Sequence, residues 1–178
     1  MLIEMVEKIK YNVLKKIDDI EIRQYPELIL AVVEKTDDNN SFNILFDYIS
    51  GNNYKKDKIK MTAPVISSTK IEMTTPVISR NNYMAFVLPS SYNKNNVPNP
   101  LNPKIKIEIQ PKKQLAVLRF SGYTSEVTVE KMKEHLLNSL KKLNIKFKGT
   151  SFLMRYNSPF TPGFLRRNEI AVEISNNK

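Results

Sequence analysis

The sequence predicts an α+β fold of strands and two main helices, arranged as two similar halves. Two observations support this: the order strand, turn, strand, helix occurs twice, and a β-branched motif is repeated in tandem. The length of 178 residues is typical of one domain. We therefore expect a single domain over residues 1–178, with pseudo-repeats at about 11–89 and 104–174.

The first half begins with a strand at 20–22, followed by a turn at 24–27. A strand at 28–34 and a helix at 41–50 complete it. The second half repeats this order with strands at 107–109 and 115–120, a turn at 111–113 and a helix at about 126–143. A proline-rich segment at 89–103 connects the halves, and a last strand is expected at 170–174.

The two predicted helices differ in the width of their apolar faces. At 100° per residue, the apolar residues of the helix at 126–143 fall within about 80° of arc, which suits packing on a sheet. Those of the helix at 41–50 cover about 200°, more than a surface helix needs. The surplus edge, formed by Phe42, Phe46 and Ile49, is either covered by a loop or available to an apolar ligand.

The tandem motif occupies residues 58–66 (KIKMTAPVI) and 70–78 (KIEMTTPVI), with seven of nine positions identical. We expect two neighbouring strands, with Pro64 and Pro76 at strand edges or bulges, because proline cannot donate to a β ladder. Met61 and Met73 either fill the core or face a ligand.

Composition narrows the function. The chain has no cysteine, which excludes disulfides, thiolate metal sites and cysteine nucleophiles, and we expect a cytoplasmic protein. No run of eighteen apolar residues predicts a membrane span. The net charge of +10 comes from lysines spread over the chain without a nucleic-acid-binding motif, so a nucleic-acid partner is not expected.

No residues predict catalysis or metal binding. The single histidine, His135, lies beside the apolar stripe of the second helix, where a structural or solvated role competes with that of a metal or haem ligand. The four glycines are too far apart for a phosphate-binding loop. No nucleophile and base are paired in the sequence, and enzymatic activity stays an open question.

A constrained loop precedes the last strand. Pro159, Pro162 and Gly163 restrict its backbone, and it displays Phe160 and Phe164, either as a lid over a pocket or as a plug into the core. It is followed by charged residues that form either a local ion pair or a site for an anionic substituent: Arg166, Arg167 and Glu169.

Together, these motifs resemble the SOUL haem-binding protein family. The resemblance is carried by residues 21–26 (EIRQYP), 48–52 (YISGN), 58–65 (KIKMTAPV) and 159–169, and it extends from about 11 to 174. It implies a distorted antiparallel β-barrel of two pseudo-symmetric halves, each with a packed helix, in the SOUL/GyrI-like class.

The resemblance also implies a function: a soluble carrier or buffer that binds haem or another tetrapyrrole non-covalently. Family members bind it in a shallow apolar cleft between the first helix and the loop before the last strand. In this chain the corresponding residues are Phe42, Phe46, Ile49, Phe160, Pro162 and Phe164.

The sequence departs from the family at the mouth of this cleft. Asn39, Asp47 and Thr161 stand where well-studied members carry basic residues, and no histidine lies near the first helix to serve as an axial ligand. Two alternatives therefore stay open: a sensor or interaction module of the same fold with a non-haem ligand, and an enzyme acting on tetrapyrroles. The sequence does not predict the oligomeric state.

Overall fold

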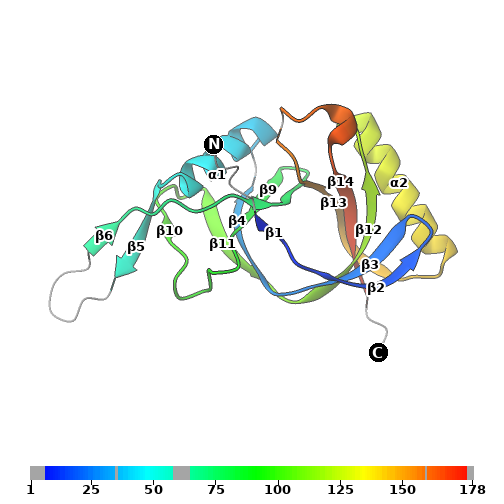
Figure 1. Cartoon of the computed structure of the whole chain (residues 1–178), viewed down its shortest axis with the longest axis horizontal. Helices are drawn as coiled ribbons and strands as arrows, with labels where there is room; N and C mark the ends of the chain where they lie inside the picture. Colours follow the sequence, from blue (N-terminus) through cyan, green and yellow to red (C-terminus); the bar gives the residue numbers. More distant parts are fainter. Residues whose placement is uncertain (1–6, 35, 58–64, 159, 176–178) are drawn as a thin grey trace. The chain divides into compact units, whose positions relative to one another are not determined.

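The computed structural model describes residues 7–34, 36–57, 65–158 and 160–175, and the chain divides into two compact units (Figure 1). Unit 1 consists of Met1–Ile9, Leu28–Val77 and Asn81–Gln110. Unit 2 consists of Lys10–Glu27, Ile78–Arg80 and Pro111–Lys178.

Each unit includes strands from the opposite predicted half. Strand β3 (Ile20–Tyr25) pairs with β12 (Lys113–Phe120), which places it in unit 2. Strand β11 (Ile105–Gln110) pairs with β4 (Leu28–Glu34), which places it in unit 1. The compact units therefore do not follow the order of the chain, because the hydrogen-bonded partner of each of these strands lies in the other half of the sequence.

Unit 1 combines one helix with three groups of strands. Its central strands run in the order β11-β4-β9 and are antiparallel, while β10-β5-β6 forms a separate antiparallel group and β1 pairs with β7 in parallel. The remaining elements of unit 1 are β1 (Glu7–Lys8), α1 (Asp38–Ile49), β5 (Asn53–Asp57), β6 (Val65–Ser67), β7 (Thr74–Thr75), β9 (Tyr83–Val87) and β10 (Asn99–Pro100).

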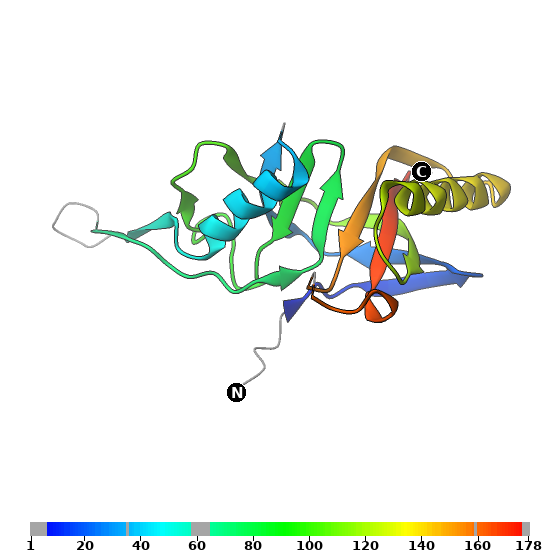
Figure 2. The same ribbon diagram turned by 90° about the horizontal axis from the view of Figure 1, so that it is seen from above.

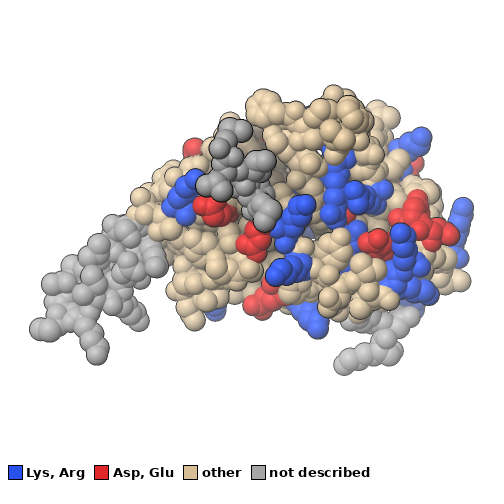
Figure 3. Space-filling view, viewed as in Figure 1, with Lys and Arg blue, Asp and Glu red and all other residues tan. Residues whose placement is uncertain are grey.

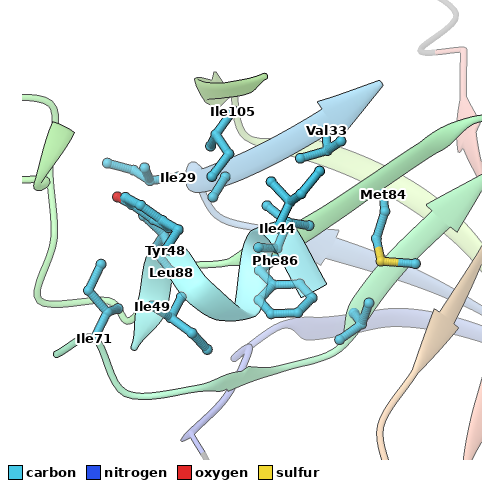
Figure 4. Packing of buried hydrophobic residues seen from close by; sticks show 13 residues of the cluster. Ile29, Val33, Ile44, Tyr48, Ile49, Ile71, Met84, Phe86, Leu88 and Ile105 are labelled. Carbon is cyan, nitrogen blue, oxygen red and sulfur yellow. The ribbon is translucent and has the colours of Figure 1, made fainter. Parts of the chain in front are cut away.

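The core of unit 1 lies between α1 and the strands β4 and β9. Figure 4 shows Ile44 and Tyr48 of the helix among the buried side chains of this core, together with Phe86 of β9. Tyr48 is fully buried, and its hydroxyl donates a hydrogen bond of 2.7 Å to the carbonyl oxygen of Pro98. Helix α1 is thereby fixed both by apolar packing and by a satisfied buried polar group.

Helix α1 begins earlier than its apolar pattern predicts. The sequence predicts a helix at 41–50, whereas α1 spans Asp38–Ile49. The reason is a capping residue: the side chain of Asp37 accepts a hydrogen bond of 2.9 Å from the backbone N–H of Asn40. The polar first turn carries no apolar residue by which periodicity would reveal it.

Unit 2 combines antiparallel strands with the longer helix. Its strands run in the order β8-β13-β14-β12-β3-β2. The other elements of unit 2 are β2 (Asn12–Ile17), β8 (Val77–Arg80), α2 (Glu126–Lys142), β13 (Phe147–Arg155), the short 3-10 helix η1 (Gly163–Leu165) and β14 (Asn168–Ile174).

Helix α2 covers these strands and confirms the predicted helix at 126–143. It contacts β12, β13 and β14 (Figure 2). Leu136 and Leu140, from the middle of its narrow apolar stripe, are completely buried in the core of unit 2. Ser125 caps its N-terminus by accepting a hydrogen bond from the backbone N–H of Thr128.

The tandem motif is described only in part. Residues 58–64 of its first copy, with Met61 and Pro64, lie outside the described residues. In the second copy Pro76 lies between β7 and β8 and belongs to neither strand, as predicted for a residue that cannot donate to a ladder. Met73 packs against the core of unit 1, which agrees with the interpretation of Met73 as core filler.

The α+β class and the packing of one helix on antiparallel strands in each unit are therefore confirmed. Within the described part of the chain, neither helix has the length and apolar character that crossing a lipid bilayer requires.

Candidate functional site

The six predicted ligand-binding residues divide between the two units. Phe42, Phe46 and Ile49 belong to α1 in unit 1, whereas Phe160, Pro162 and Phe164 belong to the loop before β14 in unit 2. Each group is described here by itself.

The aromatic edge of α1 consists of two rings. Phe42 and Phe46 stack with ring centroids 6.0 Å apart and planes at 13°. The ring of Phe42 also packs in an edge-to-face arrangement against Phe86, a core residue, with ring centroids 5.3 Å apart. Phe42 is therefore only partly exposed. Phe46 is 47% exposed, which leaves one ring of the pair open to solvent.

Ile49 lies in the core and not on this exposed edge. It is 4% exposed, and its carbonyl oxygen accepts a hydrogen bond of 2.7 Å from the backbone N–H of Ile71. Ile71, in the second copy of the tandem motif, is itself buried in the same core. Of the two alternatives predicted for the surplus edge, coverage by a loop therefore applies to Ile49, and exposure applies to Phe46.

The charges of α1 and its cap are all negative. Asp37 and Asp38 lie at its N-terminus and Asp47 in its last turns, and the helix sequence contains no lysine or arginine. The aromatic edge therefore lies on a helix that supplies no cation for a carboxylate substituent of a ligand.

The loop of unit 2 exposes its aromatic residues. Phe160 is 94% exposed and Phe164 is 78% exposed, so neither is a plug in the core. The loop is nevertheless anchored: the backbone N–H of Gly122 donates a hydrogen bond of 3.0 Å to the carbonyl oxygen of Gly163, and the ring of Tyr123 lies directly against Gly163. A Cβ atom at Gly163 would stand 2.6 Å from this ring, so any other residue at this position would displace the exposed ring of Tyr123.

The loop is followed by a buried charge network centred on Glu169. The carboxylate of Glu169, in β14, is completely buried and accepts hydrogen bonds of 2.8 and 3.1 Å from Arg23, in β3. Arg167 donates two further hydrogen bonds, of 2.7 and 3.0 Å, to the same carboxylate. Arg23 is 2% exposed and also reaches Glu21 at 2.8 Å.

Three tyrosines complete this network. Tyr156 donates a hydrogen bond of 2.9 Å to Glu169, and its ring lies 4.1 Å below the guanidinium of Arg167. Arg23 donates a hydrogen bond of 3.2 Å to Tyr25, and its guanidinium lies 4.2 Å from the ring centroid of Tyr11. Each buried charge thus has both an opposite charge and an aromatic neighbour.

Burial and the neighbouring charges shift the pKa values of the tyrosine and arginine side chains in the network. Burial raises the pKa of Tyr25 to about 12, against the opposing effect of the hydrogen bond from Arg23. Burial, with the charge of Glu169, also raises the pKa of Tyr156 far above its ordinary value. For Arg23, burial opposes the charge, but the hydrogen bond and charge of Glu169 outweigh it and raise the pKa.

The ion pair between Arg167 and Glu169 agrees with the local pairing predicted from their spacing. Sequence reasoning missed the other partner, Arg23, although strand alternation contained the signal. Ile20 and Ile22 face the core of unit 2, so Arg23 lies on the opposite face of strand β3. Arg23 is buried there, and a buried arginine requires a carboxylate as its partner. The sequence does not show which carboxylate that is.

His135 has a surface role. It is half exposed, and its Nε2 atom lies 2.8 Å from the carboxylate of Asp19. Among the described residues, no group of three or more histidine, aspartate and glutamate side chains is arranged to hold a metal ion.

We predict that Glu169→Gln lowers the free energy of unfolding by about 3–5 kcal/mol, because it leaves two arginines without their buried counter-charge. Glu173→Gln, in the same strand, is the matched control. Glu173 pairs with Lys148 near the surface, where an ion pair contributes about 1 kcal/mol or less. Urea unfolding of both variants measures the difference, and equal effects would contradict the central role of Glu169.

We further predict that stability falls as the pH rises from about 10 to 12. Tyrosine in an unfolded chain loses its proton near pH 10, whereas the pKa of Tyr25 in the folded protein is about 12. The folded state retains the proton that the unfolded state loses, so the contribution is complete below pH 10 and disappears as the pH passes 12. Tyr25→Phe should make this decline less steep, as measured by urea unfolding across the range. An unchanged slope would contradict the assignment.

Among solved structures, the crystal structure of the EcmrR C-terminal domain matches with a TM-score of 0.52 at 9% sequence identity and covers 94% of this chain and 99% of that chain. At this identity the match shows a common fold and nothing more. Two further matches have TM-scores below 0.5. One is a putative bacterial transcription regulation protein from Staphylococcus aureus MU50 (TM-score 0.43, 11% identity, 94% and 99% covered). The other is SAV2435 bound to tetraphenylphosphonium (TM-score 0.45, 10% identity, 94% of each chain covered).

No curated protein matches the chain. The family model described as "SOUL heme-binding protein" matches residues 6–173, nearly the whole chain. The match includes both α1 and the loop before β14, the two elements that carry the exposed aromatic residues. The chain belongs to the SOUL heme-binding protein family.

Proposed function

We propose that this protein binds haem or another tetrapyrrole non-covalently and acts as its carrier or buffer. The observation that carries the proposal is the stacked pair Phe42 and Phe46 on α1 of a SOUL family member, in which the ring of Phe46 is open to solvent. A flat apolar macrocycle gains most from aromatic surface that is already ordered and open to solvent.

The proposed contacts are divided into two sets. On α1, Phe42 and Phe46 contact the macrocycle, while Ile49 supports them from the core. The family resemblance adds Phe160, Pro162 and Phe164 from the loop of unit 2, all of which are exposed. Both sets are apolar, so the proposed binding rests on contacts with the face of the macrocycle.

The proposed site contains no axial histidine. The chain has one histidine, His135, which lies in α2 of unit 2 and is bound to Asp19. Unit 1 therefore contains no imidazole, and binding there depends on the aromatic edge and not on an iron–imidazole bond.

The negative charges of α1 favour a second candidate, a flat apolar ligand without carboxylates, in a sensor or interaction module. Asp37, Asp38 and Asp47 repel the propionates of haem, whereas an uncharged ligand avoids that repulsion. A titration with haem and with its dimethyl ester separates the two. Tighter binding of the ester supports the second candidate, and tighter binding of haem supports cationic partners elsewhere in the site.

We predict that Phe46→Ser weakens haem binding about tenfold, because it removes the more exposed of the two stacked rings. The measurement is a titration followed by the Soret band. Leu101→Ser, a similar change at an exposed apolar position of unit 1, is the control and should leave the affinity unchanged. His135→Ala should also leave the affinity and spectrum unchanged. A lost Soret shift in the His135 variant alone would place the site elsewhere.

We also predict that Asp47→Lys raises the affinity for haem several-fold at low salt. Repulsion between Asp47 and a propionate amounts to about 1 kcal/mol or less after screening, and lysine reverses its sign. The matched control is Glu108→Lys. Because the neighbouring Ile107 packs against the core of unit 1, Glu108 points to the opposite face of its strand. An equal gain in both variants would indicate a general charge effect.

A further inference from the structure

Among its described residues, unit 2 exposes eight large apolar side chains, and the five most exposed of them are here called the apolar patch. Their exposed fractions range from 61% to 94%, in a chain whose core residues are otherwise well buried. The patch consists of Tyr123, Val127, Phe160, Phe164 and Leu165. Exposed apolar surface of this kind marks an interaction site more often than it marks ordinary surface.

Two of the loops that carry patch residues are fastened together. The ring of Tyr123 lies against Gly163, next to Phe164 and Leu165 of η1, and the side chain of Asn168 donates a hydrogen bond of 2.9 Å to the carbonyl oxygen of Gly122. Val127 lies in the first turn of α2, directly after the loop that carries Tyr123.

The patch is also held in shape. The backbone N–H of Thr161 donates a hydrogen bond to Ser158, and that of Leu165 donates one to Pro162, each of 3.0 Å. The Nε atom of Arg166 donates a hydrogen bond of 2.7 Å to the carbonyl oxygen of Thr161. The exposed rings therefore belong to an ordered loop, and little conformational entropy is lost when a partner covers them.

Positive charge accompanies the patch. By its sequence, unit 2 contains eighteen lysines and arginines against nine aspartates and glutamates, a net charge of +9, whereas unit 1 contains ten against nine, a net charge of +1. At the patch, Arg166 stacks on Tyr123 at 4.8 Å. The exposed Lys131 lies one helical turn after Val127, and the exposed Glu126 and Glu130 also lie near Val127 on α2, so the excess of positive charge belongs to unit 2 as a whole. Figure 3 shows uncharged surface over η1, with lysine and arginine side chains beyond it.

We propose that the apolar patch docks unit 2 on the surface of a lipid bilayer that contains anionic lipids. Aromatic rings and leucine insert at the level of the head groups, and the surrounding cations attract anionic phosphates. The docking is peripheral, and it is proposed for the protein without a bound tetrapyrrole, because Phe160 and Phe164 also belong to the proposed tetrapyrrole contacts.

The same observations argue against other partners. Two copies of unit 2 that met through this patch would bring together two surfaces of net charge +9. A nucleic acid requires cations along its backbone, whereas the patch includes the aliphatic residues Val127 and Leu165.

Phe164→Trp provides a direct reporter, because the chain contains no tryptophan. Its fluorescence should shift to the blue on vesicles of equal parts phosphatidylcholine and phosphatidylglycerol, and brominated lipids should quench it. Leu143→Trp is the matched control. It lies at the other end of α2, about 24 Å from Val127 along the helix, and its emission should not change.

A second pair of variants tests the binding energy by co-sedimentation with the same vesicles. Val127→Glu with Leu165→Ser should weaken partitioning about tenfold or more, because it removes two apolar contacts and adds a repelling charge. Both positions are exposed, and a glutamate in the first turn of α2 is favourable for the helix, so the double variant should fold. Leu143→Ser should bind like the unchanged protein.

Several outcomes would overturn the proposal. The proposal would be wrong if the protein did not bind the anionic vesicles at low salt. It would also be wrong if the double variant bound the vesicles as tightly as the unchanged protein, because charge alone would then explain the binding. A dimer that becomes a monomer in the double variant would likewise overturn it, because a second copy would then cover the patch. Haem titration of the double variant separates this proposal from the function proposed above, since neither Val127 nor Leu165 belongs to the proposed tetrapyrrole contacts.

Discussion

The buried carboxylate of Glu169 is the interaction on which the arrangement of unit 2 depends. It joins β14 to β3, although β12 lies between these strands in the sheet order, and it also holds Arg167 at the end of the loop. A carboxylate without water is costly unless it is paired and hydrogen-bonded, and here two guanidinium groups and the hydroxyl of Tyr156 satisfy it. Its position at the start of β14 therefore fixes where the loop ends and the strand begins.

This interaction also accounts for the unusual surface above it. Arg167 is drawn inward to Glu169, whereas its neighbour Arg166 lies against the ring of Tyr123 near the surface. The residues before them, in η1, expose Phe164 and Leu165. Unit 2 thus buries charged groups while it exposes aromatic and aliphatic side chains, the reverse of the usual distribution. Such an inversion lowers stability unless the exposed residues meet a partner, which is the physical basis for assigning them a binding role.

Periodicity predicted the helices, and pairing between distant strands decided most of what the sequence did not reveal. Four residues of the predicted stripe of α2, Val129, Met132, Leu136 and Leu140, pack on the core of unit 2 because apolar residues at helical spacing need only a sheet to cover them, whereas the fifth, Leu143, lies after the helix and is 39% exposed. The burial of Ile49 was not predicted from the sequence. Ile49 is covered by Ile71, which belongs to the segment that follows strands β5 and β6. The pairing of β3 with β12, and with it the partner of Arg23, likewise depends on strands far apart in the sequence.

The unequal distribution of charge gives the two proposed surfaces opposite electrostatic behaviour. The aromatic edge on α1 is accompanied by Asp37, Asp38 and Asp47, so a dianionic ligand meets repulsion there. The apolar patch belongs to a unit with a net charge of +9, so an anionic bilayer is attracted to it. Salt screens both effects, over a distance of about 8 Å at physiological ionic strength. Added salt should therefore strengthen the binding of a propionate-bearing ligand at α1 and weaken the binding of anionic vesicles. If both affinities changed in the same direction, one of the two surfaces would have been assigned the wrong ligand.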